Sequence, residues 1–249
     1  MNDLETVAFV NYGHFTAIPV LEGGARGLSL HLDRLDRDAR RLFGRGLDRD
    51  EVRAGLHAAV RGHELPVNAR ITVFARDPRL DDMAGLAEPS FIVKIRPMRA
   101  PREQPPRVRS SVYQRELPEV KHVGTFGLFR ELRLAHQAGY DDVLLVDEDG
   151  WISEGSFWNI GFHDGERIIW PAAPALAGVE MRLLRDVLAH ETRNVHLSDL
   201  RGFRAAFMTN AIAGPTLIAS IDDVTFPPNP ELAAQLDTAH KAIPLEPLV

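Results

Sequence analysis

The sequence predicts a two-domain α/β (α+β) fold, in which a smaller N-terminal α+β domain precedes a larger C-terminal domain. The length of 249 residues suffices for one large domain or two small ones. Strand and helix patterns both occur in the N-terminal part, and a stretch rich in proline and arginine, 97–106, follows them. We therefore expect a small domain over 1–99, a linker over 100–111 and a larger domain over 112–249.

The N-terminal elements are predicted from the spacing of apolar residues. Residues 9–30 hold apolar runs on both sides of the turn Glu22-Gly23-Gly24, which predicts a strand, a hairpin turn and a second strand. From Leu32 onward apolar residues recur at helical spacing, and the helix is expected to end by Gly44. A second helix is predicted over 48–62, and strands are predicted over 69–75 and 90–95.

The C-terminal elements follow from the same patterns. Apolar residues at helical spacing predict helices over 126–138 and 182–190. Short apolar runs predict strands over 142–146 and 159–162, and residues 205–212 form a further buried run. A loop with three prolines, 227–230, then precedes a final helix over 231–241.

Charge and composition exclude several classes of function. A net charge of −6 gives no general attraction for nucleic acid or anionic lipid. The chain has no cysteine, which excludes disulfides, a thiolate nucleophile and cysteine-ligated metals. The N-terminus lacks the features of a signal peptide, and no apolar run approaches the ~18 residues of a membrane span. We expect a cytoplasmic protein with no membrane, nucleic-acid or metal partner.

Chemistry that needs a primary amine has three candidates, because Lys94, Lys121 and Lys241 are the only lysines among the 29 basic residues. Lys121 lies in the stretch Glu119–Gly124, after extended residues and before a predicted helix. Lys94 lies inside a predicted strand and Lys241 lies near the C-terminus. Taken alone, Lys121 is better explained as an exposed surface lysine, because lysines are usually exposed.

Two further segments change the setting of this lysine. Glu154 lies between small polar and aromatic residues, directly before an apolar strand. One partner for such a carboxylate is a pyridine nitrogen, which it keeps protonated so that the ring can withdraw electrons. The alternative is an ordinary turn glutamate. Residues 174–182 place Gly178 before a helix, and such loops present backbone N–H groups to phosphate, although many helices begin after a glycine.

Motifs around these residues extend over most of the chain. Lys121 is followed by the segments 138–147 and 150–159, which contains Glu154. The pattern extends upstream and downstream to four more segments: 11–16, 30–35, 176–182 and 207–212. Together they resemble the class IV (fold type IV) aminotransferase family, whose enzymes depend on pyridoxal 5'-phosphate (PLP). That family includes branched-chain and D-amino-acid aminotransferases and aminodeoxychorismate lyase. The resemblance implies PLP in the cleft between two domains, and a homodimer.

The resemblance also implies roles for individual residues. Lys121 would be the Schiff-base lysine and the acid/base that moves a proton at the substrate α-carbon, and Glu154 would bind the pyridine nitrogen. Arg34 would bind the phosphate, since a guanidinium fork suits an anion. Backbone groups of the pairs Gly178-Val179 and Ala211-Ile212 would complete the phosphate site.

The substrate side and the reaction are less constrained by the sequence. Phe15, Thr16 and Arg70 are expected on the substrate side; Arg70 would bind a substrate carboxylate, or would simply lie at a strand edge. The first reaction hypothesis is transfer of an amino group from an amino acid to a 2-oxo acid. Thr16 and the pair Asn210-Ala211 resemble the lyases, so release of pyruvate and 4-aminobenzoate from aminodeoxychorismate is the second. A scaffold that has lost the chemistry is the third, which the joint presence of Lys121 and Glu154 disfavours.

Overall fold

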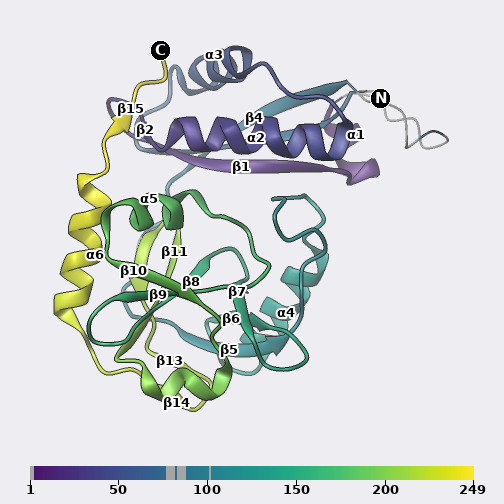
Figure 1. Cartoon of the computed structure of the whole chain (residues 1–249). Coiled ribbons are helices and arrows are strands. Elements are labelled where there is room, and N and C mark those ends of the chain that lie inside the picture. Colours follow the sequence, from purple (N-terminus) through teal and green to yellow (C-terminus); the bar gives the residue numbers. More distant parts are fainter. Residues whose placement is uncertain (1–2, 77–81, 83–87, 101) are drawn as a thin grey trace. The chain divides into compact units, whose positions relative to one another are not determined.

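The computed structural model of the protein describes residues 3–76, 82, 88–100 and 102–249 (Figure 1). Its elements, in chain order, are α1 (Asp3–Val10), β1 (Gly13–Val20), β2 (Ala25–Arg26), α2 (Leu28–Phe43), α3 (Arg49–Val60), β3 (Val67–Ala75), β4 (Pro89–Pro97), β5 (Arg107–Val112), α4 (Phe126–Gln137), β6 (Asp142–Val146), β7 (Ile152–Gly155), β8 (Asn159–His163), β9 (Ile168–Pro171), α5 (Val179–Val187), β10 (His190–Arg193), the 3-10 helix η1 (Leu197–Gly202), β11 (Ala205–Asn210), β12 (Gly214–Leu217), β13 (Ser220–Ile221), β14 (Val224–Thr225), α6 (Pro230–Ala242) and β15 (Leu245–Glu246).

The chain folds into two compact units, each described here by itself. Unit 1 comprises Met1–Arg99, Val120–Gly124 and Pro244–Val249, and unit 2 comprises Ala100–Glu119 and Thr125–Ile243. The predicted mixed α/β fold with two groups of sheets is confirmed. The residue limits drawn for the domains and the linker stay a prediction.

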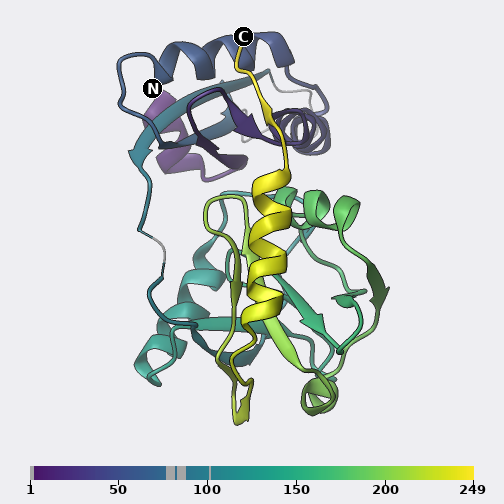
Figure 2. The same ribbon diagram turned by 90° about the vertical axis from the view of Figure 1, so that its left-hand side faces the viewer.

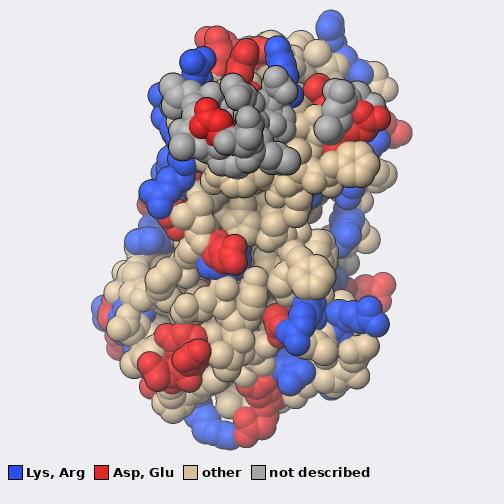
Figure 3. Space-filling model, turned by 90° about the vertical axis from the view of Figure 1, so that its right-hand side faces the viewer, with Lys and Arg blue, Asp and Glu red and all other residues tan. Residues whose placement is uncertain are grey.

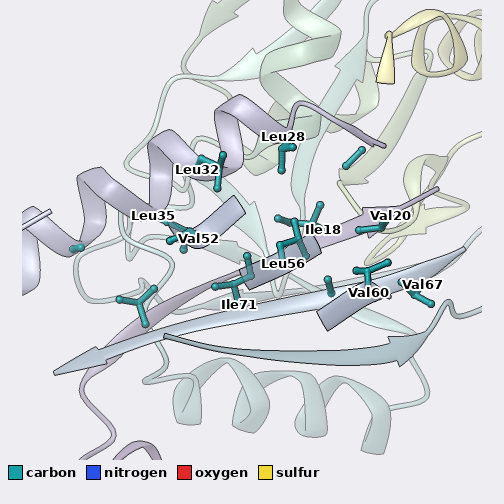
Figure 4. Packing of buried hydrophobic residues seen from close by; sticks show 14 of the residues in the cluster. Ile18, Val20, Leu28, Leu32, Leu35, Val52, Leu56, Val60, Val67 and Ile71 are labelled. Atoms are coloured by element: carbon teal, nitrogen blue, oxygen red, sulfur yellow. The ribbon is translucent and has the colours of Figure 1, made fainter. Parts of the chain in front are cut away.

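Unit 1 is built on an antiparallel sheet in the order β1-β3-β4, with α2 and α3 packed on one face. Alternate residues of β1 and β3, such as Ile18 and Ile71, point toward these helices, as expected for a strand with one covered face. Figure 4 shows Leu32 of α2 and Leu56 of α3 packed over them. The hydrophobic core of unit 1 therefore lies between this sheet and these two helices.

Helix α2 ends at Phe43, directly before Gly44, as the sequence predicts. Gly44 takes the left-handed conformation at φ 72°, which costs glycine least, and its N–H donates to the Arg40 carbonyl. The next helix, α3, begins after Asp48, whose carboxylate accepts from the N–H groups of Asp50 and Glu51. Both predicted helices and the predicted strands β3 and β4 are confirmed.

Unit 2 contains two five-stranded sheets, ordered β10-β9-β8-β11-β12 and β14-β13-β5-β6-β7. A large apolar cluster joins residues of both, including Trp158, Ile160 and Phe162. A second cluster lies under α5 and α6 and includes Trp170, Leu184 and Leu236. Because β7 and β8 belong to different sheets, the residues 156–158 that connect them pass from one sheet to the other.

Four expectations about elements are corrected by the structure. Residues Asp3–Val10 form helix α1, so the first strand begins only at Gly13, and the second strand of the expected hairpin is just Ala25–Arg26. Residues Arg107–Val112, mostly assigned to a linker, form β5, because they pair in parallel with β6. Helix α5 runs over Val179–Val187 and not over 182–190, because Gly178 is its N-cap.

The fourth correction concerns the buried run 205–212. Strand β11 ends at Asn210, and residues 211–213 form a turn into β12. The cause is the side chain of Asn210, whose Oδ1 accepts from the N–H groups of Ile212 and Ala213 at 3.0 and 2.9 Å.

The length of the helices and the distribution of surface charge bear on the expected absence of membrane and nucleic-acid partners. Over the part of the chain that the structure describes, no helix is long and apolar enough to cross a membrane. On the face shown in Figure 3, clusters of basic and acidic side chains lie next to one another rather than forming a field of one sign.

Candidate functional site

Lys121 lies in a segment, Val120–Gly124, that is bonded to the outer edge of β1; we call it the lysine segment. The Lys121 carbonyl accepts from the Phe15 N–H at 2.9 Å, and the Val123 N–H donates to the Gly13 carbonyl at 2.9 Å. On the other side, the Lys121 N–H donates to Asp38 Oδ2 of helix α2 at 3.3 Å. Both polar groups of the Lys121 backbone are therefore held, so its side chain leaves from a fixed point.

The Lys121 side chain lies beside Phe15. Its Nζ is 5.0 Å from the centre of the Phe15 ring, and Arg70 Cζ is 3.7 Å from the same centre, which limits the separation of the two cations to 8.7 Å. Arg70 Nε donates to Thr72 Oγ1 at 3.2 Å, and no described carboxylate lies within 4.0 Å of its guanidinium. The pKa of Arg70 is lowered by burial and by Arg96. A negative ligand would relieve this burial of positive charge.

Arg34 and Thr16 meet His31 in a buried cluster next to the lysine segment. Arg34 Nη2 donates to Thr16 Oγ1, and that hydroxyl lies 2.6 Å from His31 Nδ1. Burial lowers the pKa of His31 well below its usual value, and Arg34 and Lys121 lower it further. The Thr16 hydroxyl therefore accepts from Arg34 and shares a second hydrogen bond with His31 Nδ1. This network orients the guanidinium of Arg34.

Two more titratable residues pack into the same cluster. His14 is fully buried, and neither ring nitrogen has a hydrogen-bond partner among the described residues. Burial, with Arg34 and Arg37, lowers its pKa from 6.5 to about 3, so it is neutral in the fold. Asp38 is also fully buried; burial raises its pKa, while its bond with Arg37 opposes that rise.

In unit 2, Glu154 of β7 has a partner that the sequence did not reveal. Its Oε1 lies 3.0 Å from Arg115 Nη1, and both side chains are nearly buried, at 7% and 6% exposure. Its Oε2 accepts from the Leu176 N–H at 3.2 Å. Arg115 also donates to the Pro118 carbonyl, at 2.9 Å. The carboxylate is therefore fixed by a guanidinium and a backbone N–H.

The loop before α5 is fixed by the same strands. Asn159 of β8 donates from Nδ2 to the Leu176 carbonyl at 2.8 Å, so Glu154 and Asn159 together hold both polar groups of Leu176. A Cβ on Gly178 would overlap Asn159 Oδ1, which is why a glycine is required there. The N–H groups of the first turn of α5, starting with Val179, have no intrahelical acceptor, as in any helix. No side chain of the N-cap residue replaces that acceptor. These are the groups that bind anions at helix N-termini.

The turn after β11 holds the remaining predicted phosphate residues, Ala211 and Ile212. The Ile212 N–H already donates to Asn210 Oδ1, so this N–H is less suited to a phosphate than expected. Thr209, the neighbour of this turn on β11, pairs across the strands with Asn159. Its hydroxyl is buried with no partner among the described residues, although such a group costs free energy unless it is hydrogen-bonded.

The structure thus gathers the predicted residues within each unit. Unit 1 brings together Lys121, Phe15, Thr16, Arg34 and Arg70, and unit 2 joins Glu154 to Gly178 and Val179 through Leu176. Sequence reasoning missed Asp38, which lies on the face of α2 that carries His31 and Arg34 at helical spacing and could have been found from it. It also missed Arg115 and Asn159, for which no local signal exists.

Comparison with known proteins identifies the family. A model of the family described as amino-transferase class IV matches residues 13–221. The chain belongs to the class IV aminotransferase family. The match includes the lysine segment, Glu154, α5 and the turn after β11. Among curated proteins, no sequence matches this chain.

Solved structures of this family have the same fold. A proposed 4-amino-4-deoxychorismate lyase from Legionella pneumophila has a TM-score of 0.87 at 18% identity, covering 98% of this chain and 96% of its own. A branched-chain aminotransferase from Thermoproteus uzoniensis has a TM-score of 0.87 at 18% identity, covering 100% and 94%. A hypothetical aminotransferase from Mycobacterium tuberculosis in its PLP-bound form has a TM-score of 0.84 at 19% identity, covering 98% and 93%. These TM-scores show that the chain has the fold of these proteins, the fold type IV architecture.

The donor groups of this chain fit the parts of PLP. A fixed primary amine at Lys121 suits its aldehyde carbon, and a buried carboxylate at Glu154 suits its ring nitrogen. The uncapped N-terminus of α5, opened by the absence of a side chain at Gly178, suits its phosphate. The buried Thr209 hydroxyl adds a polar group near the same loops.

Proposed function

We propose that the protein is a PLP-dependent aminotransferase that transfers an amino group from an amino acid to a 2-oxo acid. The observation that supports this best is the pair of fixed groups, Lys121 on the edge of β1 and Glu154 in its bond to Arg115. Lys121 is half-buried beside Phe15, unlike an exposed surface lysine, and Glu154 is buried against a guanidinium, unlike an ordinary turn glutamate.

Each residue then has a defined task. PLP, when bound, supplies a protonated ring that withdraws electrons from the substrate α-carbon. Glu154, held against Arg115, would accept a hydrogen bond from the ring nitrogen and keep it protonated. Lys121 Nζ takes the proton from the α-carbon and returns it to the product. Arg34 and the N–H groups that follow Gly178, from Val179 onward, bind the phosphate together with Ala211, while the Ile212 N–H, which already donates to Asn210, contributes less.

The substrate side is proposed to lie along β1 and β3 of unit 1. Arg70, which has no acidic partner among the described residues and lies at most 8.7 Å from Lys121 Nζ, is suited to a substrate carboxylate. The Phe15 ring contacts both cations and gives this region an apolar surface, and Thr16 orients Arg34 from the other face of the strand.

The second candidate is aminodeoxychorismate lyase activity. Thr16 in the first motif and Asn210 at the end of β11 resemble the lyases, and the Legionella pneumophila protein has the same fold. Both reactions use the same cofactor groups, so Lys121 and Glu154 do not distinguish them. The family also supports a homodimer in the cytoplasm, which analytical ultracentrifugation and cell fractionation would check.

Absorbance spectroscopy tests the cofactor. Wild type loaded with PLP should absorb near ~410–430 nm, and borohydride should attach the cofactor to Lys121, detectable by peptide mass spectrometry. Lys121→Ala should lose both signals. Lys241→Ala, whose lysine pairs with Asp237 on the surface, is the matched control and should keep them. A protein that stays colourless with added PLP would contradict the proposal and support a scaffold.

Single-turnover reactions separate the two enzymes. The loaded protein is mixed with single L- and D-amino acids, and the loss of the ~410–430 nm band is followed together with the 2-oxo acid formed. Conversion by at least one amino acid supports the aminotransferase. No conversion by any amino acid, with pyruvate released from aminodeoxychorismate, would replace it with the lyase.

A further inference from the structure

His240, near the end of α6, bonds to a side chain in the first turn of α5 and lies next to Gly214, at the end of the turn after β11. Its Nδ1 lies 2.7 Å from Glu180 Oε1. Glu180 lies in the first turn of α5, directly after Val179, and is 2% exposed. Helix α6 packs against both α5 and β12, and Figure 2 shows it running along unit 2.

The other edge of the His240 ring faces the turn after β11. Its Nε2 and Cε1 atoms are 3.5 Å from the point where a Cβ on Gly214 would lie, so the ring is in van der Waals contact with that position. Gly214, at φ 64°, ends the turn that contains Ala211 and Ile212. One imidazole therefore lies against the first turn of α5 on one side and against the end of the turn on the other.

The chemistry of Glu180 explains why this contact matters for an anion. A carboxylate in the first turn of a helix interacts favourably with the helix dipole and competes with a phosphate for the same N–H groups. The hydrogen bond to His240 holds the Glu180 carboxylate toward α6. If that bond is lost, the buried carboxylate needs other donors, and the N–H groups at the start of α5 suit a carboxylate.

We propose that His240 is a positioning residue for the phosphate site of PLP. It fixes the start of α5, through Glu180, and the turn that ends at Gly214, and so sets how tightly the phosphate is bound. This inference rests on the proposed function, because it assumes that the ligand is PLP. It concerns the phosphate alone and leaves Lys121 and Glu154 untouched.

Comparing PLP with pyridoxal, which lacks the phosphate, isolates this effect. His240→Phe keeps a ring against Gly214 and removes the bond to Glu180. PLP should bind about tenfold more weakly to this variant, as expected for one hydrogen bond to a charged group. Pyridoxal should bind within about twofold of wild type, since it makes no phosphate contacts. Dissociation constants come from fluorescence titration of the apoprotein.

Three further variants make the result decisive. His240→Asn places an amide N–H near the position of Nδ1 and should restore most of the PLP affinity. Glu180→Gln removes the other partner; it should weaken PLP in the same way, and it replaces His240→Phe if that variant does not fold. Lys241→Ala, the exposed neighbour, should bind both ligands as wild type does.

The outcomes distinguish the two proposals. A wild type that binds neither ligand overturns the proposed function, and the role of His240 with it. A wild type that prefers PLP, with the same ratio of affinities in His240→Phe and Glu180→Gln, overturns only the role of His240. Equal weakening of PLP and pyridoxal in both variants would also overturn it, because it would indicate a general effect on packing.

Discussion

The two units hold their candidate cofactor groups by different means. Unit 1 presents side chains: Lys121 and Arg34, anchored by a sheet edge and by a buried face of α2. Apart from Glu154, unit 2 presents backbone N–H groups, whose positions are set by Asn159, Asn210 and His240. The residue types at the binding positions should therefore matter most in unit 1. In unit 2 the residues that shape the backbone should matter more than those that bind.

The largest effect is expected at Glu154, the one side chain that unit 2 presents to the cofactor, which is buried in a pair with Arg115. Arg115→Met leaves the carboxylate buried without its guanidinium, which should lower the free energy of unfolding by about 3–5 kcal/mol. Urea denaturation of the apoprotein measures it. Arg201→Met, from a pair exposed at 70% and 80%, is the control and should change it by less than about 1 kcal/mol. If both variants lower the free energy of unfolding by the same small amount, the Arg115–Glu154 pair does not stabilise the fold as proposed.

A second prediction compares a binding side chain with a binding backbone. Arg34→Gln should raise the dissociation constant of PLP about 10- to 100-fold, because a charge-assisted contact with the phosphate is lost. Ala211→Ser changes a side chain where only the backbone is proposed to bind, and should stay within about threefold. Fluorescence titration measures both. If the two variants raise the dissociation constant of PLP equally, the proposal that unit 1 binds through side chains and unit 2 through backbone is wrong.

The third prediction concerns the pH dependence of unit 1. Because the pKa of His14 is about 3 in the fold and 6.5 when exposed, the unfolded chain takes up a proton that the folded chain excludes between these values. Stability is thus fully present above pH 6.5 and falls as the pH drops toward 3, by about 1.4 kcal/mol per pH unit from His14. His14→Leu should remove that slope, measured by denaturation between about pH 4 and pH 7. An unchanged slope would refute the assignment to His14.

The smallest expected effect is on the lysine segment. Asp38→Asn weakens the acceptor of the Lys121 N–H, and hydrogen exchange at that amide should become about fivefold faster, as for the loss of about 1 kcal/mol. Asp36→Asn, on the same helix but bonded to Arg40 and Leu47, should leave this exchange unchanged. Mass spectrometry of the peptide containing Lys121 reads both. Equal rates in the two variants would show that Asp38 does not hold the segment.

The same contrast explains what could be predicted from the sequence. The helix α2, with its apolar spacing and Gly44, is local, and so was found; Lys121, Arg34 and Glu154 lie in recognisable motifs. Arg115 and Glu154 are 39 residues apart and His240 and Glu180 are 60 apart, and no spacing rule links such pairs. Strand β5 was missed because its alternation is mostly polar, and its pairing with β6 depends on residues far along the chain.

The lysine segment also covers the free edge of strand β1. Strand β1 pairs with β3 on one side only, so without the segment its other edge would present unsatisfied N–H and C=O groups. Phe15 and Gly13 use these groups to bind the segment. The stretch that fixes the reactive amine is thereby also the cover of a strand edge, and a shortened or displaced segment would open that edge to strands of other molecules.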